Sequence, residues 1–385
     1  MDKFKKSTLL SEGMVEKRLE GEDIVLSRTR AKKAEPGDPS PEVQLRYPQN
    51  QTIATHGFVR SLTRRTEEDG TLFYYDVPIG NEVATTVCMI DIDKCKSARI
   101  ECHQPFSEYD WNVYNAVVSL YKAGNELITP PAVYRMMTGC DVHDIGDGQL
   151  LAVCKSLDKL RFTRLVLDCS QELRERGIQL DSQDVLRGMY DTYLLNASAM
   201  RARSAGFALV ALKLETDPVL YHYAALTGQV LQVPTKMFKI CRVEEDADGK
   251  LFATEDLVKN NESRIKIKGY LARRVRAASN PHRSASCKIV FRSYQYKSEH
   301  RFGLYEVAGY EDGECPPIHA KRIRGYVEEV LRYWIAVGYV SGYKFLYDKK
   351  NARVISGISI EIPPWTSAVW SGDAASAALP SAAAG

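Results

Sequence analysis

The sequence predicts an α+β protein in which an order of three helices followed by a β-hairpin occurs twice. Residues 105–231 show helical spacing of apolar residues and then strand-like composition, and residues 261–363 return to the same order. The chain before these units is strand-like, and both ends are polar or of low complexity. With 385 residues and 44% hydrophobic content, the chain is long enough for two or three domains.

The two ends of the chain are predicted to be disordered. Residues 1–45 are polar, and "RTRAKKAEPGDPSPE" mixes bases with Gly and Pro, which favours an extended, mobile segment. Residues 364–385 include the Ala/Ser tail "SGDAASAALPSAAAG", whose low complexity also favours disorder. Neither end offers enough apolar residues for a core.

Residues 46–104 predict a small β-rich leader. The stretches "LFYYDVPIG" and "VATTVCMIDI" are rich in β-branched and aromatic residues, and Gly80-Asn81 between them is a turn signal. No functional pattern is evident in this leader.

The first unit opens with three predicted helices. "SEYDWNVYNAVVSLYKAGN" begins at a capping residue, Ser107, and repeats apolar residues at helical spacing. Thr129 then precedes two prolines, which is the expected order of a helix cap and a first helical turn. The third helix, over residues 148–162, has an apolar stripe on one side and Lys155 and Lys159 on the other.

Strands complete the first unit. "TRLVLDC" follows the third helix, and "DTYLLNASAM" and "GFALVALKL" predict a hairpin with Arg201 and Arg203 in its tip. Helix, short helix, helix and hairpin is the order of a winged-helix domain, a helix-turn-helix variant with a β wing.

The second unit repeats this order after a predicted linker at residues 232–260. "ESRIKIKGYLARRVRAASN" predicts its first helix, the region around "ASCKIVFRSYQYK" leaves room for a short second helix, and "IHAKRIRGYVEEVLRYW" predicts a long third helix. "YVSGYKFLY" and "ARVISGISIEI" then predict a hairpin with Lys349 and Lys350 at its tip. The repeat is one of architecture, since residue identity between the units is slight.

Positive charge is concentrated at the start of the second unit. Residues 262–283 hold seven Lys or Arg against one acid, whereas the excess over the whole chain is only three. Clustered bases suit a phosphate backbone, because each neutralised phosphate releases a condensed counterion. Since acids at helical spacing are nearly missing, we expect these bases to supply most of the DNA affinity. They are Arg264, Lys266, Lys268, Arg273, Arg274, Arg276 and Arg283.

The third helix of each unit is predicted to enter the major groove, because the N-terminal part of that helix faces the bases in helix-turn-helix proteins. In the second unit this part carries Lys321, Arg322 and Arg324. Further along, Arg324, Glu328 and Arg332 form an i, i+4, i+8 ladder that is typical of ordinary surface. The matching set in the first unit is Lys155, Lys159, Arg161 and Arg164, with Asp158 nearby.

The wing tips are predicted to contact phosphates or the minor groove, because each tip carries two bases. These are Arg201 with Arg203 in the first unit and Lys349 with Lys350 in the second.

Patterns of catalytic chemistry do not assemble. The sequence has no GxxxxGK[ST] loop and no GxSxG elbow. His319 and Arg322 reproduce an HxxR spacing, and Arg274, Lys288 and Tyr343 supply the other residue types of a tyrosine recombinase; among 21 tyrosines such a match is expected by chance. We expect no enzymatic turnover, with a tyrosine-dependent nuclease or recombinase as an alternative.

The cysteines and the hydropathy indicate a reduced, cytoplasmic protein without a cofactor. The nine cysteines are scattered, with no CxxC pair or His/Cys cluster of the kind that zinc requires. No apolar run approaches the roughly 18 to 20 residues that span a bilayer. We therefore expect no metal, no cofactor and no membrane partner.

Four stretches resemble the replication initiator proteins of bacterial plasmids and mobile elements, in particular those with tandem winged-helix domains. "WNVYNAVVSLYKAGNELITPPAVYRMMTG" is the most specific, followed by "KSLDKLRFTRLVLD", "YLARRVRAASN" and "VLRYWIAVGYVSGYKF". The resemblance covers roughly residues 107 to 362. It implies binding of origin repeats in double-stranded DNA, recruitment of host replication factors, a monomer or homodimer, and a plasmid- or nucleoid-associated location. A transcriptional regulator of the same element remains an alternative, because it would use the same groove-reading surface.

Overall fold

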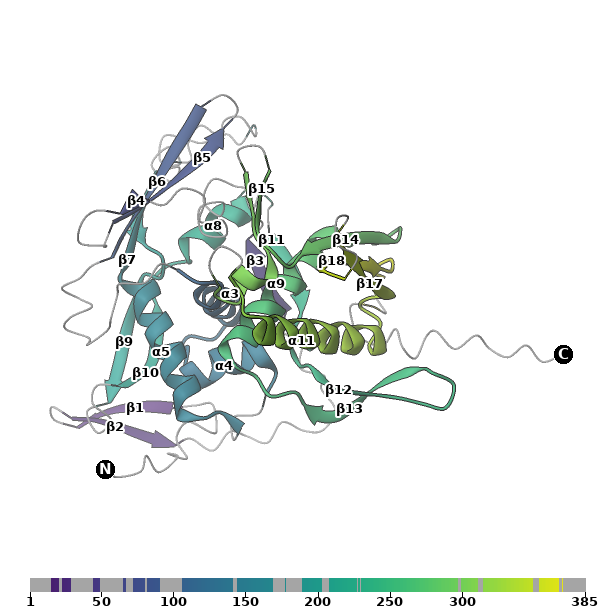
Figure 1. Cartoon of the computed structure of the whole chain (residues 1–385). Coiled ribbons are helices and arrows are strands. Elements are labelled where there is room, and N and C mark those ends of the chain that lie inside the picture. The colour runs from purple at the N-terminus through teal and green to yellow at the C-terminus, as the bar shows by residue number, and fades with distance from the viewer. Residues whose placement is uncertain are drawn as a thin grey trace.

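The structure is a computed structural model of the whole chain (Figure 1). The fold is α+β, with helices at the centre and small antiparallel sheets around them. No helix among the described residues is long and apolar enough to cross a membrane. The structure describes residues 15–20, 23–28, 44–48, 65–66, 72–79, 82–90, 106–140, 144–168, 177, 189–202, 208–226, 228, 230–296, 299–310, 314–348, 353–366 and 369.

Three helices open the first unit, as predicted: α3 (Glu108–Lys122), α4 (Pro130–Thr138) and α5 (Asp147–Phe162). At the start of α3, Asp110 N donates to Ser107 Oγ at 3.4 Å and Ser107 N donates to Asp110 Oδ2 at 2.7 Å, a reciprocal cap. Thr129 caps α4, and the helix ends at Gly139 in the left-handed conformation, with φ of 69°.

The strands of the first unit are β7 (Thr163–Asp168), β8 (Met189–Tyr193), β9 (Ala197–Ala202) and β10 (Ala208–Leu214). The predicted single strand "DTYLLNASAM" is therefore wrong, because β8 pairs with β7 and β9 pairs with β10. Ile128, between α3 and α4, forms a bridge to Leu212 of β10, with N–O distances of 2.8 Å in both directions. The helix α8 (Val219–Leu226) and the strand β11 (Val230–Pro234) follow.

The predicted leader does not form a sheet of its own. Its strands β4 (Arg65–Thr66), β5 (Leu72–Ile79) and β6 (Glu82–Ile90) continue into β7 and β8 in the order β4-β5-β6-β7-β8. β5 pairs with β6 in antiparallel register, with Ile79 opposite Glu82. The predicted turn at Gly80-Asn81 lies outside the described residues.

The second unit contains α9 (Glu262–Ala278), β14 (Ala285–Val290), α10 (Leu304–Val307), α11 (Pro317–Ala336), β17 (Gly342–Tyr347) and β18 (Ile355–Ile362). A small hairpin, β15 (Tyr294–Tyr296) with β16 (Glu299–Arg301), lies between β14 and α10. The stretch "ASCKIVFRSYQYK" is thus mainly strand, and the short helix lies after it. The predicted hairpin of β17 and β18 is confirmed, and β14 extends it to a sheet of order β14-β18-β17.

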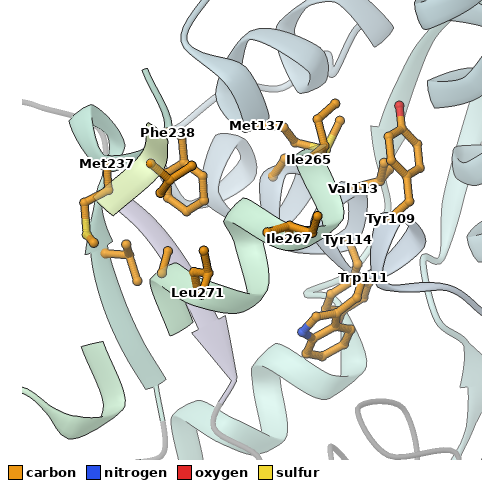
Figure 2. Packing of buried hydrophobic residues seen from close by; sticks show 14 of the residues in the cluster. Tyr109, Trp111, Val113, Tyr114, Met137, Met237, Phe238, Ile265, Ile267 and Leu271 are labelled. Atoms are coloured by element: carbon orange, nitrogen blue, oxygen red, sulfur yellow. The ribbon is translucent and has the colours of Figure 1, made fainter. Parts of the chain in front are cut away.

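The predicted linker is not a spacer. It holds the 3₁₀-helix η4 (Thr235–Phe238) and a hairpin of β12 (Cys241–Glu245) and β13 (Leu251–Leu257). Met237 and Phe238 are buried, and Trp334 of α11 donates from Nε1 to Met237 O at 3.0 Å. One apolar cluster includes residues of both units, and Figure 2 shows Ile267 and Leu271 of α9 with Phe238 on one side and α3 on the other. The two units therefore share one core.

Parts of both predicted disordered ends are structured. β1 (Val15–Glu20) pairs with β2 (Asp23–Arg28), and β3 (Gln44–Pro48) pairs with β11. At the other end, Trp365 is only 2% exposed and donates from Nε1 to Tyr339 O at 3.3 Å. The prediction for the remaining residues of both ends, apart from residues 364, 366 and 369, lies outside the described residues.

Candidate nucleic-acid interface

The first turns of α11 present two exposed bases. The helix begins after Pro316, and Ile323, Val327 and Trp334 bury its apolar face, which turns Lys321 and Arg322 outward. The structure thus brings together two of the three bases predicted for this turn.

The third base of that turn, Arg324, is anchored. Its Nη1 donates to the hydroxyl of Tyr305 on α10 at 3.1 Å, so it holds the short helix against α11. The predicted Arg324–Glu328–Arg332 ladder is wrong, because each member has a partner elsewhere. Glu328 accepts a hydrogen bond from Tyr343 at 2.9 Å, and Arg332 lies 3.6 Å from a carboxylate oxygen of Glu245.

The predicted basic surface over residues 262–283 is corrected by burial. Lys266, Lys268 and Arg273 are at most 8% exposed, because α9 packs into the protein on more than one side. Lys266 and Arg273, seven residues apart, lie on one side of the helix, and Lys268 lies nearly opposite. Lys266 pairs with Glu262 at 2.6 Å, an i, i+4 pair that the sequence contained, and Arg273 pairs with Glu108 of α3. A buried, paired side chain does not reach a phosphate, so we remove these three from the candidate surface.

The amine of Lys268 is fully buried without a carboxylate partner. Its Nζ donates to Phe238 O at 2.6 Å and to Asn260 Oδ1 at 3.1 Å. Burial lowers the pKa of this amine to about 7, because an apolar interior disfavours the charged form. Lys268 therefore joins α9 to the supposed linker.

Other bases of the stretch lie at or near the surface. Arg274 and Arg283 are exposed, and Arg274 Nη2 donates to Lys288 O at 3.4 Å. Arg264 Nη1 donates to Lys259 O at 2.7 Å. Arg276 is half-buried, and its Nε donates to Gln232 O at 2.9 Å. Only the first two are well placed for a nonspecific phosphate contact.

In the first unit, three of the bases predicted to contact DNA are paired with carboxylates. Lys155 is exposed on α5, whereas Lys159 is 3.0 Å from Asp110 Oδ2. Arg161 and Arg201 both pair with the buried carboxylate of Asp158, at 3.3 Å and 2.5 Å. Arg201 thus lies in β9 and links the wing to α5. Of the predicted set, Lys155 and the exposed Arg164 of β7 remain at the surface.

Two lysines that sequence reasoning did not place on this surface lie on the three-stranded sheet. Lys288 of β14 and Lys344 of β17 are exposed, and both are in register with Ser359 of the central strand. The signal was the alternation of polar and apolar residues in these strands. The predicted tip residues Arg203, Lys349 and Lys350 lie outside the described residues.

Two of the residues considered for recombinase chemistry, Tyr343 and His319, lie within hydrogen-bond distance of other side chains. The hydroxyl of Tyr343 donates to Glu328, and burial together with this bond raises its pKa to about 12. His319 Nδ1 lies 2.6 Å from the hydroxyl of Tyr310, while Arg322 points outward from the same helix. In the part of the chain that the structure describes, no group of three or more His, Cys, Asp or Glu is arranged to hold a metal ion.

Comparison with known proteins adds little to this geometry. No protein-family model matches the sequence, and no curated protein sequence matches it at a significant level. A search of solved structures finds similarity to the Pi initiator protein, whose crystal structure is in complex with iteron DNA. The match covers 72% of this chain and 96% of that chain, with 10% identity and a TM-score of 0.35. At that score the likeness carries no argument about this chain.

Proposed function

We propose that this chain is a sequence-specific, double-stranded DNA-binding protein built on two winged-helix units, and that it initiates replication of a plasmid or an integrated element without enzymatic turnover. The observation that carries the proposal is the order of the second unit. The order is a helix, a strand, a small hairpin of β15 and β16, a short helix, a long helix and a second hairpin, and the strand β14 pairs with the returning strand β18. This is the order of a helix-turn-helix with a wing.

The first unit supports the same interpretation, with a single β-bridge where the second unit has the strand β14. The Ile128 bridge to Leu212 occupies the place of β14, since it lies between the first two helices and pairs with the hairpin. Two such units on one chain suit successive major grooves, which lie about 34 Å apart on one side of B-form DNA. We therefore propose that the protein binds repeated sites in an origin of replication.

The roles of the bases follow from their exposure. Lys321 and Arg322 on α11, and Lys155 on α5, are proposed to contact base edges. Five other exposed bases, none of them on α5 or α11, are proposed to contact phosphates: Arg164, Arg274, Arg283, Lys288 and Lys344. These five bases take the place of Lys266, Lys268 and Arg273 as the expected source of affinity, because those three are buried.

The proposed role as an initiator rests on the resemblance in the sequence. Two experiments distinguish an initiator from a transcriptional regulator. The first begins with selection of bound duplexes from a random pool by the full-length protein. Enrichment of a repeated motif, bound with an affinity that falls as salt rises, is the expected result. Failure to enrich any duplex would refute sequence-specific binding.

The second step distinguishes initiation from regulation. A minimal plasmid that carries the enriched repeats is expected to replicate only when the protein is supplied, and the Arg322→Ala variant is expected to lose this activity. The matched control is Lys250→Ala, which removes an exposed charge at the β12–β13 hairpin, away from α11's first turns. Repeat binding without replication would leave the regulator as the function.

A further inference from the structure

Three large apolar side chains are exposed where a DNA surface is proposed. Ile318 on α11 is 59% exposed, Leu151 on α5 is 57% exposed, and Tyr347 at the end of β17 is 55% exposed. They are the most exposed large hydrophobic side chains among the described residues. Single exposed apolar residues are common on protein surfaces. The location of Ile318 and Leu151 on the third helix of each unit is what needs an explanation.

The exposed face of α11 combines three kinds of residue at helical spacing. Ile318, Lys321 or Arg322, and Gly325 follow one another at intervals of three or four residues, so they lie on one face. Gly325 has nothing within 4 Å of the position where a Cβ would stand. This face therefore offers an aliphatic side chain and a cation beside a low point that lets another surface approach the backbone.

The exposed face of α5 repeats this combination. Gly148, Leu151 and Lys155 lie at intervals of three and four residues, and all are exposed. Gly148 also has open space at its Cβ position. The core stripe of the same helix, including Val153 and Leu157, is fully buried, so Leu151 is not a frayed part of the core. The two helices share the combination although their sequences differ.

The chemistry of this face fits the major groove of a thymine-containing site. Thymine is the base that presents a methyl group there, and aliphatic side chains contact it, while Arg and Lys bind the acceptors of guanine. The neighbouring positive charges complement the phosphates that flank the groove. A hydrophobic protein partner would not account for cations at both sites.

We infer that Ile318 and Leu151 are specificity-determining residues that contact the C5-methyl groups of thymine. Each half-site then carries a thymine close to the base contacted by Arg322 or by Lys155. This inference rests on the proposed function, because it deepens the recognition that the two helices perform.

Replacement of thymine by deoxyuridine tests this contact, because it removes one methyl group and keeps base pairing. The probe is the duplex that the full-length wild-type protein enriches from the random pool, with each thymine replaced in turn. In each half-site, replacement at one position is expected to weaken binding by about fourfold, the factor for losing one buried methyl group. Replacement elsewhere is expected to leave binding unchanged.

Two variants assign the contacts. Ile318→Ala is expected to bind the thymine duplex as weakly as the wild type binds the uracil duplex, and to lose its sensitivity to uracil in one half-site. Leu151→Ala is expected to do the same in the other half-site. The control is Leu226→Ala, which truncates a side chain of α8 that is 42% exposed, and which is expected to keep both the affinity and the uracil effect. Thermal unfolding of all three variants is expected to match the wild type.

The outcomes separate this inference from the proposed function. An enriched duplex that binds equally well with uracil at every position overturns the thymine contact and leaves sequence-specific binding intact. A uracil effect that persists in both Ala variants overturns the assignment to these residues. If no duplex is enriched, the proposed function fails and the inference fails with it.

Discussion

Two basic helices of the second unit have similar composition and opposite structural roles. In α9 the bases Lys266, Lys268 and Arg273 are buried. Arg273 joins α9 to α3, Lys268 joins it to η4, and Lys266 pairs with Glu262 of α9 itself. In α11 the bases Lys321 and Arg322 point to solvent. A local excess of positive charge therefore does not identify a nucleic-acid surface by itself. What distinguishes the two helices is whether the apolar stripe and the bases occupy opposite faces.

The largest expected effect is on the free energy of unfolding, and it tests the structural role of α9. Arg273→Ala leaves the carboxylate of Glu108 buried without its partner, and burial already raises the pKa of that group. We expect a loss of about 3 kcal/mol in the free energy of unfolding, measured by urea denaturation. Arg274→Ala, one residue along and exposed, is the control and is expected to change stability by less than about 0.5 kcal/mol. Equal effects of the two variants would contradict the division of this helix into a buried and an exposed face.

The next effect concerns DNA and compares Arg322 with Arg274. Arg322→Ala is expected to reduce discrimination between the enriched duplex and random DNA by about 1 to 3 kcal/mol. Arg274→Ala is expected to weaken both duplexes evenly and to lower the slope of log affinity against log salt by about 1. Salt titrations on both duplexes measure these changes. Indistinguishable titrations would refute the separation into base and phosphate contacts.

The pH dependence of stability tests Lys268. Its pKa is about 7 in the folded protein and near 10.4 in an unfolded chain, so between these values the unfolded chain binds more protons. Stability contributed by this group therefore rises with pH across that window, by up to about 1.4 kcal/mol per pH unit, and is lost as pH falls towards 7. Lys268→Met removes this contribution. The difference in free energy of unfolding between wild type and Lys268→Met is expected to shift in favour of the wild type from pH 7 to pH 10, and a constant difference would contradict the burial of a neutral amine.

The smallest expected effect concerns the bond between α11 and the wing. Tyr343→Phe removes the hydrogen bond to Glu328 and keeps the ring, so we expect a loss of about 1 kcal/mol in stability. DNA binding is expected to remain. Incubation with labelled DNA followed by denaturing electrophoresis checks the enzymatic alternative. A covalent complex in the wild type that is lost in Tyr343→Phe would restore the recombinase hypothesis.

Local signals in the sequence were sufficient to predict most helices and the hairpin of β17 and β18. Ser107 and Thr129 are capping residues whose effect depends only on near neighbours, and the structure confirms both. The apolar stripe of α11 likewise determines which side of that helix is buried.

Long-range packing explains what sequence reasoning missed. The burial of Arg273 depends on Glu108, a residue 165 positions earlier, and no local pattern reports that contact. Residues 232–260 are predicted to be a linker between the two units, whereas Met237 and Phe238 within them are buried in the apolar cluster that both units share. Fewer of the predicted bases are available for DNA for the same reason. Lys159 pairs with Asp110 of α3, and Arg201 pairs with Asp158 of α5.

The pairing of β3 with β11 has a consequence for how the chain is made. Leu45 lies opposite Val233, so the strand that is synthesised early has no partner until most of the first unit has left the ribosome. Closing so long a loop costs entropy before the contacts that reward it can form, and nonlocal pairings of this kind slow folding. The first unit and residues 230–234 are therefore expected to reach their final arrangement together, late in synthesis, and not one domain after the other.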